Sequence, residues 1–187
     1  MLSGQWSYWN GPDEIDRREK YSGDFLPDYQ TNGDELQKRI AALAFEFTNE
    51  TGIFLPLGYS SGWRPASVNK ATKNSGTRST HLRAKGGDKR DSVDGAFSWW
   101  CMQNETALEE HMLWMEHPVA TVVRSWKLAL EQQRPPTPWC HLQSEPPQSG
   151  VRCYFPDSKA VTEWRDYLSI GGLVGMSHSA WLSLMAE

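Results

Sequence analysis

The chain has 187 residues, a length typical of one compact domain that buries a core without disulfide bonds. Its net charge is -4, and Lys and Arg are scattered among Asp and Glu, which excludes a strongly basic nucleic-acid-binding surface. The three cysteines have no metal-knuckle or disulfide spacing, and neither a run of about 18 apolar residues nor a charged start before an apolar core is present, so we expect no membrane span and no secretory signal.

Two different patterns occupy the first fifty residues. Residues 1–30 are rich in Gly, Pro, Asp, Tyr and Trp without a clear period, which predicts an irregular N-terminal arm with little regular structure. Residues 34–50 predict an amphipathic helix that Asn32 or Asp34 would cap and Gly52 would end. Its apolar residues recur at helical spacing: Leu36, Ile40, Leu43, Ala44 and Phe47.

Shorter elements follow along the rest of the chain. Residues 53–61 indicate a buried strand that Pro65 ends, a polar loop reaches about Thr80, and residues 81–88 suit a strand and turn. Helices are expected at 96–103, 119–132 and 159–168 and strands at 139–143 and 151–155, whereas 108–116 fits either. These elements predict an α+β fold, a small and mainly antiparallel sheet with flanking helices, over residues 31–170, followed by a tail at 171–187.

Three side chains are candidate metal ligands. His81 and Asp88 are seven positions apart with three small residues between them, and a strand with a tight turn would bring both to one point. His141, on the later predicted strand, could supply a third ligand. Two imidazoles and one carboxylate leave a fourth position open on a tetrahedral zinc ion, the pattern of a catalytic site. Spacing alone leaves open that these are ordinary polar residues.

Three motifs carry a resemblance to a known family. Residues 79–88 read S-T-H-L-R-A-K-G-G-D, similar to the S-x-H-x-x-G-x-A-x-D motif of the D-alanyl-D-alanine carboxypeptidase and hedgehog-type zinc peptidases. Residues 139–141 resemble the W-x-H element of that family, and residues 61–65 with Asn69 resemble its S-G-x-R-x-x-x-x-N lead-in. Ala84 and Gly86 stand at the Gly and Ala motif positions, an exchange that preserves size and that we expect to be harmless.

The resemblance covers about residues 55–155 and includes details of phage-encoded members, such as Pro146-Pro147 followed by Ser149-Gly150. It implies Zn²⁺ held by His81, Asp88 and His141, and hydrolysis of an amide bond in peptidoglycan stem or cross-link peptides. A phage enzyme would be made in the host cytoplasm, or carried in the virion, and would act on the bacterial cell wall. Its N-terminal arm could contact other virion proteins.

One departure from the family concerns the catalytic acid. Family members commonly place a carboxylate just before the last histidine, but residues 134–140 contain no Asp or Glu. A peptidase needs a base for the attacking water, so we expect a substitute. Glu116 is preferred, because Met112, Trp114 and Glu116 would share one face of a strand. Glu145, past His141, and Glu131, on the predicted helix at 119–132, are weaker candidates.

Two further residues have roles that the resemblance implies. Arg64 matches the family arginine that holds a substrate carboxylate, although it could instead pin its own loop. Ser79 matches a position that bonds substrate or groups behind the ligands, or it could cap a turn. The missing acid and the aromatic arm favour a rival interpretation: a phage structural or attachment protein that keeps the fold and metal site without turnover.

Overall fold

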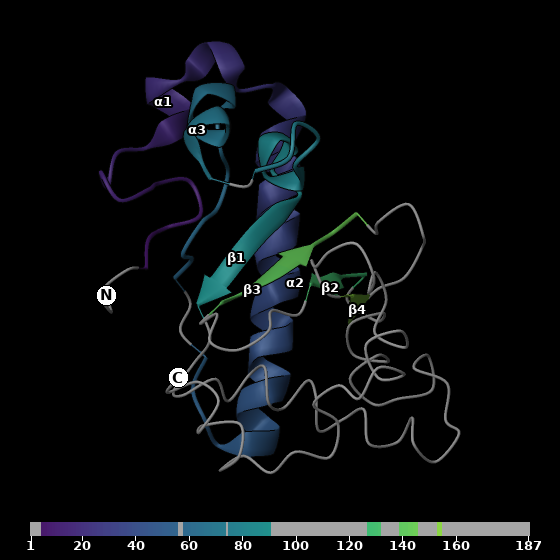
Figure 1. The fold of residues 1–187 in the computed structure, drawn as a ribbon. Helices are drawn as coiled ribbons and strands as arrows, with labels where there is room; N and C mark the ends of the chain where they lie inside the picture. Colours follow the sequence, from purple (N-terminus) through teal and green to yellow (C-terminus); the bar gives the residue numbers. More distant parts are fainter. Residues whose placement is uncertain are drawn as a thin grey trace.

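The structure is a computed structural model of the chain, and it describes residues 5–55, 58–73, 75–90, 127–131, 139–145 and 153–154. In these ranges a long helix lies beside a small four-stranded sheet, and shorter helices gather toward one end of the long helix (Figure 1). The predicted α+β class is confirmed for this part of the chain. The elements predicted at 96–103, 108–116 and 159–168, and the tail at 171–187, lie outside the described residues.

Helix α2, Pro27–Thr51, supplies a continuous part of the core. All five apolar positions named from the periodicity are at most 5% exposed, which confirms that face: Leu36, Ile40, Leu43, Ala44 and Phe47. Gly52 ends the helix as predicted, with a φ of 70° and its N–H on the Thr48 carbonyl at 2.8 Å. No helix in the described ranges is both long and apolar enough to cross a membrane.

The predicted start of this helix is wrong. The helix begins at Pro27, with Leu26 as N-cap, so neither Asn32 nor Asp34 caps it. Proline suits a first helical position because its fixed φ is already helical and its missing N–H would have no partner there. Asp28 adds a negative charge near the positive end of the helix dipole.

The N-terminal segment is part of the core, and the expectation of little regular structure is wrong for its second half. Helix α1 spans Arg17–Lys20, the 3-10 helix η1 spans Ser22–Asp24, and α2 crosses the predicted boundary at residue 30. Tyr8 and Trp9 are 1% and 6% exposed and pack edge to face at 4.9 Å. Tyr8 also packs edge to face against Tyr59 at 5.2 Å. Such long-range aromatic contacts leave no periodic signal in the sequence.

The region between α2 and the metal motif differs from its prediction in two places. The described residues of 53–61 form no strand, and their pairing is limited to isolated bridges of Tyr59 with Trp6 and of Ser61 with Asp88. The predicted polar loop contains helix α3, Ala66–Ala71, which begins directly after Pro65. The Asn69 side chain closes the turn beyond α3, since Nδ2 donates to the Gly76 carbonyl at 3.1 Å.

The sheet has the strand order β1-β3-β2-β4. Strands β1 (Gly86–Arg90) and β2 (Ala129–Glu131) lie antiparallel on either side of β3 (Trp139–Gln143), and β4 (Cys153–Tyr154) pairs parallel with β2. The strand at 139–143 is confirmed with its bounds. The strand predicted at 151–155 is described only as β4, and the helix predicted at 119–132 is wrong for 129–131.

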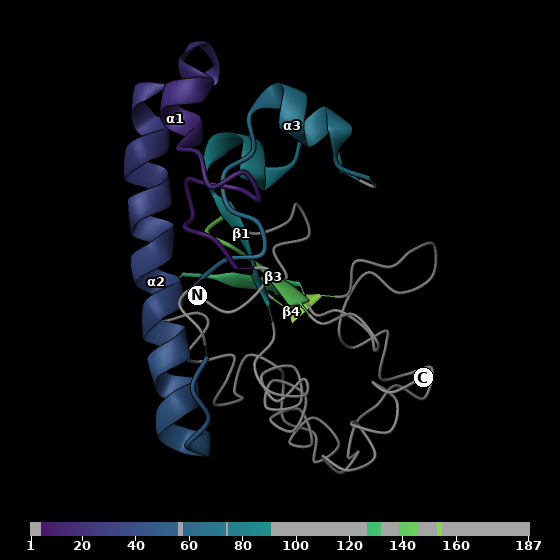
Figure 2. The ribbon, with the colours of Figure 1, turned by 90° about the vertical axis from the view of Figure 1, so that its left-hand side faces the viewer.

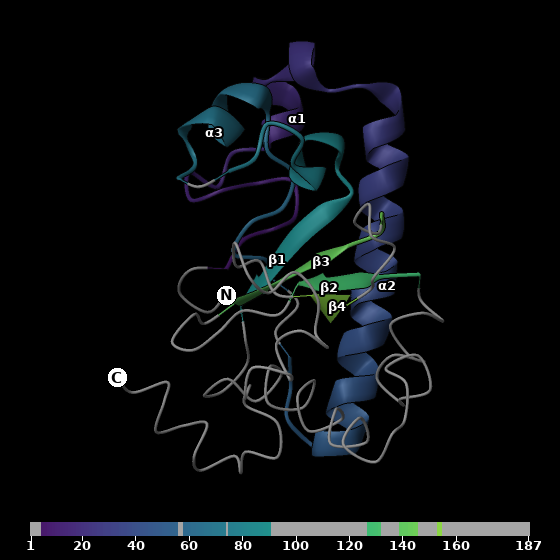
Figure 3. The same ribbon diagram turned by 45° about the vertical axis from the view of Figure 1, so that its right-hand side comes forward.

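Helix α2 covers one face of the sheet. After a turn of the view by 90° it stands at one side of the strands, with α1 and α3 toward its upper end (Figure 2). The view turned by 45° in the opposite sense shows the strands lying beside helix α2 (Figure 3). Leu142 on β3 is fully buried, as are Leu128 and Ala129 before and within β2. The sheet therefore has a rigid support behind the strands that carry the candidate ligands.

Candidate metal centre

His81 is positioned by a short 3-10 turn just before β1. The turn η2 spans Thr80–Arg83, Ser79 is its N-cap, and Ala84 ends it in the left-handed conformation, so the predicted strand and turn occur in the reverse order. The imidazole is 3% exposed, and its Nδ1 lies 2.7 Å from the Gly62 carbonyl oxygen. A carbonyl only accepts, so Nδ1 carries the proton and Nε2 presents a lone pair.

His141 is oriented by its own strand. Its Nε2 lies 3.0 Å from Gln143 Oε1 and 3.2 Å from Thr80 Oγ1. The Gln143 amide nitrogen donates to the Glu145 carbonyl, which turns Oε1 toward the imidazole. Nε2 of His141 is therefore the protonated nitrogen, and Nδ1 presents the lone pair.

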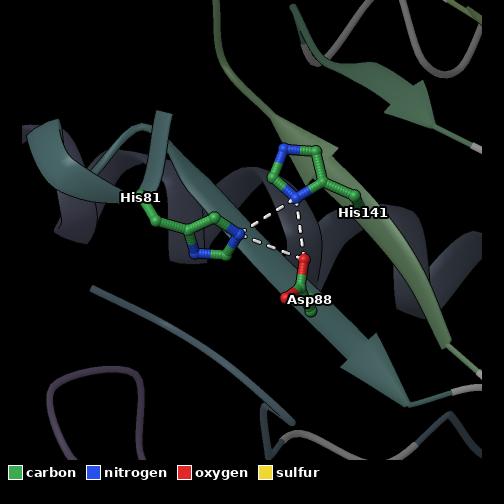
Figure 4. A group of neighbouring side chains, drawn as sticks. All are labelled: His81, Asp88 and His141. Carbon is green, nitrogen blue, oxygen red and sulfur yellow. Dashed lines mark hydrogen bonds and ion pairs between the residues drawn. The ribbon is translucent and has the colours of Figure 1, made fainter. Parts of the chain in front are cut away.

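The two lone pairs meet at the Asp88 carboxylate. His81 Nε2, His141 Nδ1 and Asp88 Oδ1 form a triangle with sides of 3.2, 3.1 and 2.7 Å. Figure 4 shows the three side chains converging from η2, β3 and β1, with helix α2 behind the strands. Two lone pairs and an anionic oxygen repel one another unless a cation lies between them.

The donor set fits a divalent metal ion. A tetrahedral zinc ion with bonds of about 2.0–2.1 Å separates its ligand atoms by about 3.3 Å. The observed triangle has nearly this size, and all three residues are buried, with ligand atoms within 4.8 Å of one another. Two imidazole nitrogens and one carboxylate oxygen are a donor set that zinc accepts. The group could hold a metal ion, to which the protein would supply three ligands.

Asp88 reaches the site with one oxygen while Arg64 holds the other. Arg64 Nη2 lies 2.6 Å from Asp88 Oδ2, and Arg64 Nε donates to Ser61 Oγ at 2.7 Å. Burial by itself raises the pKa of the Asp88 carboxyl, but the interactions with the facing His81 and His141 imidazoles outweigh it and hold that pKa far below its usual range. The carboxylate is thus ionised and limited to one oxygen on the metal side.

The lead-in motif forms the scaffold of the site. Ser61 pairs with Asp88 through the backbone, where Asp88 N donates to the Ser61 carbonyl at 2.7 Å. Gly62 supplies the carbonyl for His81, and a Cβ there would collide with the Tyr8 carbonyl. Trp63 is fully buried, and its indole donates to the Leu82 carbonyl at 3.2 Å. Residues 61–64 therefore fix two of the three candidate ligands.

The His81 imidazole is suited to metal binding over ordinary pH. Burial lowers the pKa of His81 below its usual value, although the Asp88 carboxylate beside it acts in the opposite direction. The neutral imidazole, the form that binds metals, is the form that this environment favours.

The other predicted site residues are distributed as follows. Arg64 is in the centre, bonded to Asp88, and Ser79 caps η2, with its Oγ accepting from His81 N at 3.4 Å. Glu145 forms ion pairs with Arg83 at 2.6 Å and Lys85 at 3.5 Å. Glu116 lies outside the described residues, as do His111, His117 and His178.

Sequence reasoning missed the residues that orient the ligands. Gln143 and Thr80 bond the far nitrogen of His141. A signal for Gln143 was present, since residues two apart on a strand share a face. Thr80 had no comparable signal, because its contact depends on how η2 packs on β3. In comparisons with known proteins, no family model matches the chain, and neither a curated protein nor a solved structure is significantly similar to it.

Proposed function

We propose that this chain is a zinc-dependent peptidase that hydrolyses an amide bond in peptidoglycan stem or cross-link peptides, encoded by a bacteriophage. The observation that carries the proposal is the triangle of His81 Nε2, Asp88 Oδ1 and His141 Nδ1. Both histidines have their other nitrogen bonded, so that all three groups present electron pairs to one point. Three protein ligands with an open fourth position are the arrangement of catalytic zinc sites.

The substrate class comes from the sequence motifs. Residues 61–65, 79–88 and 139–141 resemble the family elements in the family's order, and those elements surround the candidate metal centre. A zinc ion, when bound, supplies Lewis-acid polarisation of a carbonyl and makes water a better nucleophile near neutral pH. The chain's own task is then to orient the peptide and to move a proton.

Arg64 is the residue for peptide orientation. A guanidinium has five N–H donors in a planar fork, of which the bonds to Ser61 and Asp88 use Nε and Nη2. The side chain thus has further donors for a substrate carboxylate, at a site next to the ligand oxygen of Asp88. Ser79 supports the same function indirectly, as the cap of the turn that presents His81.

A metal-bearing phage structural protein without turnover is the competing function. The absence of Asp and Glu from residues 134–140 favours it. The N-terminal arm now supports it less, because Tyr8 and Trp9 are buried in the chain's own core and are not presented to a neighbouring subunit. The Tyr8 hydroxyl donates to the Gly86 carbonyl at 3.0 Å, so this segment buttresses the strand that carries Asp88.

The test combines metal content with cleavage of purified peptidoglycan. Protein purified without added chelator is analysed for bound metal by mass spectrometry, and sacculi of several cross-link types are then digested and their muropeptides analysed. We expect one zinc ion per chain and new amine and carboxyl ends in stem or cross-link peptides, both lost in His81→Ala. Stoichiometric zinc without cleavage of any wall type would overturn the peptidase and support the structural protein.

A further inference from the structure

Charge is unevenly distributed along the chain, and the candidate metal centre lies in its most basic part. Residues 58–90 hold eight of the 19 basic residues of the chain but one of its 23 acidic residues, Asp88, although the net charge of the whole chain is -4. A local excess of one sign of charge raises the concentration of oppositely charged ligands beside it. The segment that carries two of the three candidate ligands therefore favours an anionic partner.

The basic side chains of this segment differ in their surroundings. Arg83 and Lys85 share the Glu145 carboxylate, at 2.6 and 3.5 Å, and Lys89 is 1% exposed. Three others are exposed, and their side chains form no hydrogen bond or ion pair in the described part of the chain: Lys70, Lys73 and Arg78. We refer to these three residues as the basic surface.

The segment that carries the basic surface is fixed to the metal centre at both ends. At one end Arg64 Nη2 is paired with Asp88 Oδ2 at 2.6 Å, and Arg64 N lies 3.3 Å from the carbonyl oxygen of His81, the ligand at the other end. Between them Asn69 Nδ2 donates to the Gly76 carbonyl at 3.1 Å, which folds the chain back on itself, and helix α3 contacts η2 (Figure 2). The basic surface is thus held beside the ligands.

The carboxylates that the structure places against this segment are engaged by other groups. Asp24 Oδ2 accepts from the backbone N–H of Ala66, at the start of α3, at 3.1 Å. Asp88 is paired with Arg64 and faces the two candidate histidine ligands, and Glu145 is paired as described above. Among the described residues no carboxylate is ion-paired with the basic surface, so its charge is open to a ligand from outside.

We propose that Lys70, Lys73 and Arg78 form a docking surface for the free carboxylates of peptidoglycan stem peptides and draw these peptides toward the metal centre. The choice of partner rests on the peptidase function proposed above. A stem peptide that is not cross-linked ends in a free carboxylate, and many such peptides along one strand make an anionic polymer. Exposed charges act over about 8–10 Å at moderate salt, and they raise association rates more than they stabilise the bound complex.

The first measurement is the binding of the full-length, zinc-loaded protein to sacculi from which phosphate polymers have been removed, by sedimentation in the cold. The triple variant Lys70→Glu/Lys73→Glu/Arg78→Glu should bind at least about 10-fold more weakly than the unaltered chain at low salt. Lys73→Glu alone should show a smaller loss. Lys38→Glu, the same exchange at an exposed lysine of α2, is the matched control and should show none. Zinc content and circular dichroism check that the variants are folded.

Salt and chemical modification identify the charge on the partner. Raising the salt from about 0.01 M to about 1 M shortens the Debye length from about 30 Å to about 3 Å, and the triple variant and the unaltered chain should then bind alike. Amidation of the carboxylates of the sacculi should weaken binding of the unaltered chain to the level of the triple variant. Equal binding to amidated and untreated sacculi, or equal binding of the two proteins at low salt, would overturn the docking surface. Binding only to walls that keep their phosphate polymers would overturn the carboxylate partner in favour of a phosphodiester.

Cleavage kinetics separate docking from chemistry. The triple variant should raise KM for sacculi and leave kcat unchanged, because the basic surface binds the substrate and the transition state alike. A fall in kcat at unchanged KM would contradict a docking role. Binding that depends on salt and on the basic surface, without cleavage of any wall type, would overturn the peptidase function and support the docking surface.

Discussion

The two halves of the candidate metal centre are held in different ways. His81 and Asp88 come from one continuous stretch and are braced by residues 61–64 through both backbone and side-chain hydrogen bonds. His141 comes from a distant strand and is oriented by the side chains of Gln143 and Thr80. The first half is held by hydrogen bonds from residues 61–64, whereas the second depends on the register between β1 and β3. Variants in the first half should therefore affect folding, and variants in the second should affect mainly the metal.

The largest difference is expected between Asp88→Asn and His141→Gln. Asp88→Asn leaves the Arg64 guanidinium, whose side chain is 12% exposed, without its anionic partner. Breaking a buried ion pair from one side costs about 3 kcal/mol or more. His141→Gln should lose zinc equally but cost no more than about 1.5 kcal/mol, since no charge is left unpaired. Urea unfolding with a chelator present measures the free energy of unfolding of both variants. Equal losses of stability would contradict the distinction between the two halves.

A second prediction concerns Gly62, in the segment that holds His81 and Asp88. In Gly62→Ala the new methyl group meets the carbonyl of Tyr8, a backbone atom that can only move with the N-terminal segment. Overpacking of this kind costs about 1–3 kcal/mol and should also displace the Gly62 carbonyl that orients His81. Gly23→Ala, where nothing lies within 4 Å of the added Cβ, is the matched control. Thermal unfolding of the two variants should separate them, and similar melting temperatures would argue against the close approach.

The third prediction tests how His141 is oriented. Gln143→Leu removes the acceptor from His141 Nε2 and keeps the side-chain size. Loss of such an outer partner typically weakens metal affinity by about 10- to 100-fold. Chelator competition measures the affinity, and circular dichroism checks that the fold is kept. Thr80→Val, which removes the second contact at 3.2 Å, should have a smaller effect in the same direction. Unchanged affinity in both Gln143→Leu and Thr80→Val would mean that β3 alone orients the imidazole.

The difference between local and long-range contacts also explains which parts of the structure could be predicted from the sequence. The core face of α2 was predictable because Leu36, Ile40 and Phe47 repeat at the helical period, and the ligand set because local motifs contain it. The strand β2 was mistaken for a helix, since a short apolar run such as residues 128–130 fits either structure. The burial of Tyr8 and the pairing of Glu131 with His141 could not be predicted. Both arise from contacts between segments far apart in the chain, which no local period records.

The smallest expected effect concerns the exchange of small residues in the metal motif, which was expected to be harmless. Ala84 has a φ of 55°, a left-handed conformation in which a Cβ is unfavourable by about 1–2 kcal/mol and glycine is not. Gly86 has the reverse problem, because a Cβ there would meet Thr80 Oγ1 and come within 2.8 Å of His141 Cε1. The exchange is therefore not neutral at either position.

Exchanging Ala84 and Gly86 for the residues of the resembled motif, one at a time, separates these effects. Ala84→Gly should raise the free energy of unfolding by up to about 1 kcal/mol, reduced by the greater entropy of glycine in the unfolded chain. Zinc affinity should stay unchanged, because His81 keeps its bond to Gly62. Gly86→Ala should instead weaken zinc binding, since the methyl group displaces either Thr80 or the His141 ring. Two outcomes would contradict this: Gly86→Ala could stabilise the protein, or only Ala84→Gly could lose metal affinity. Either result would show that η2 and β3 lie farther apart than in the structure.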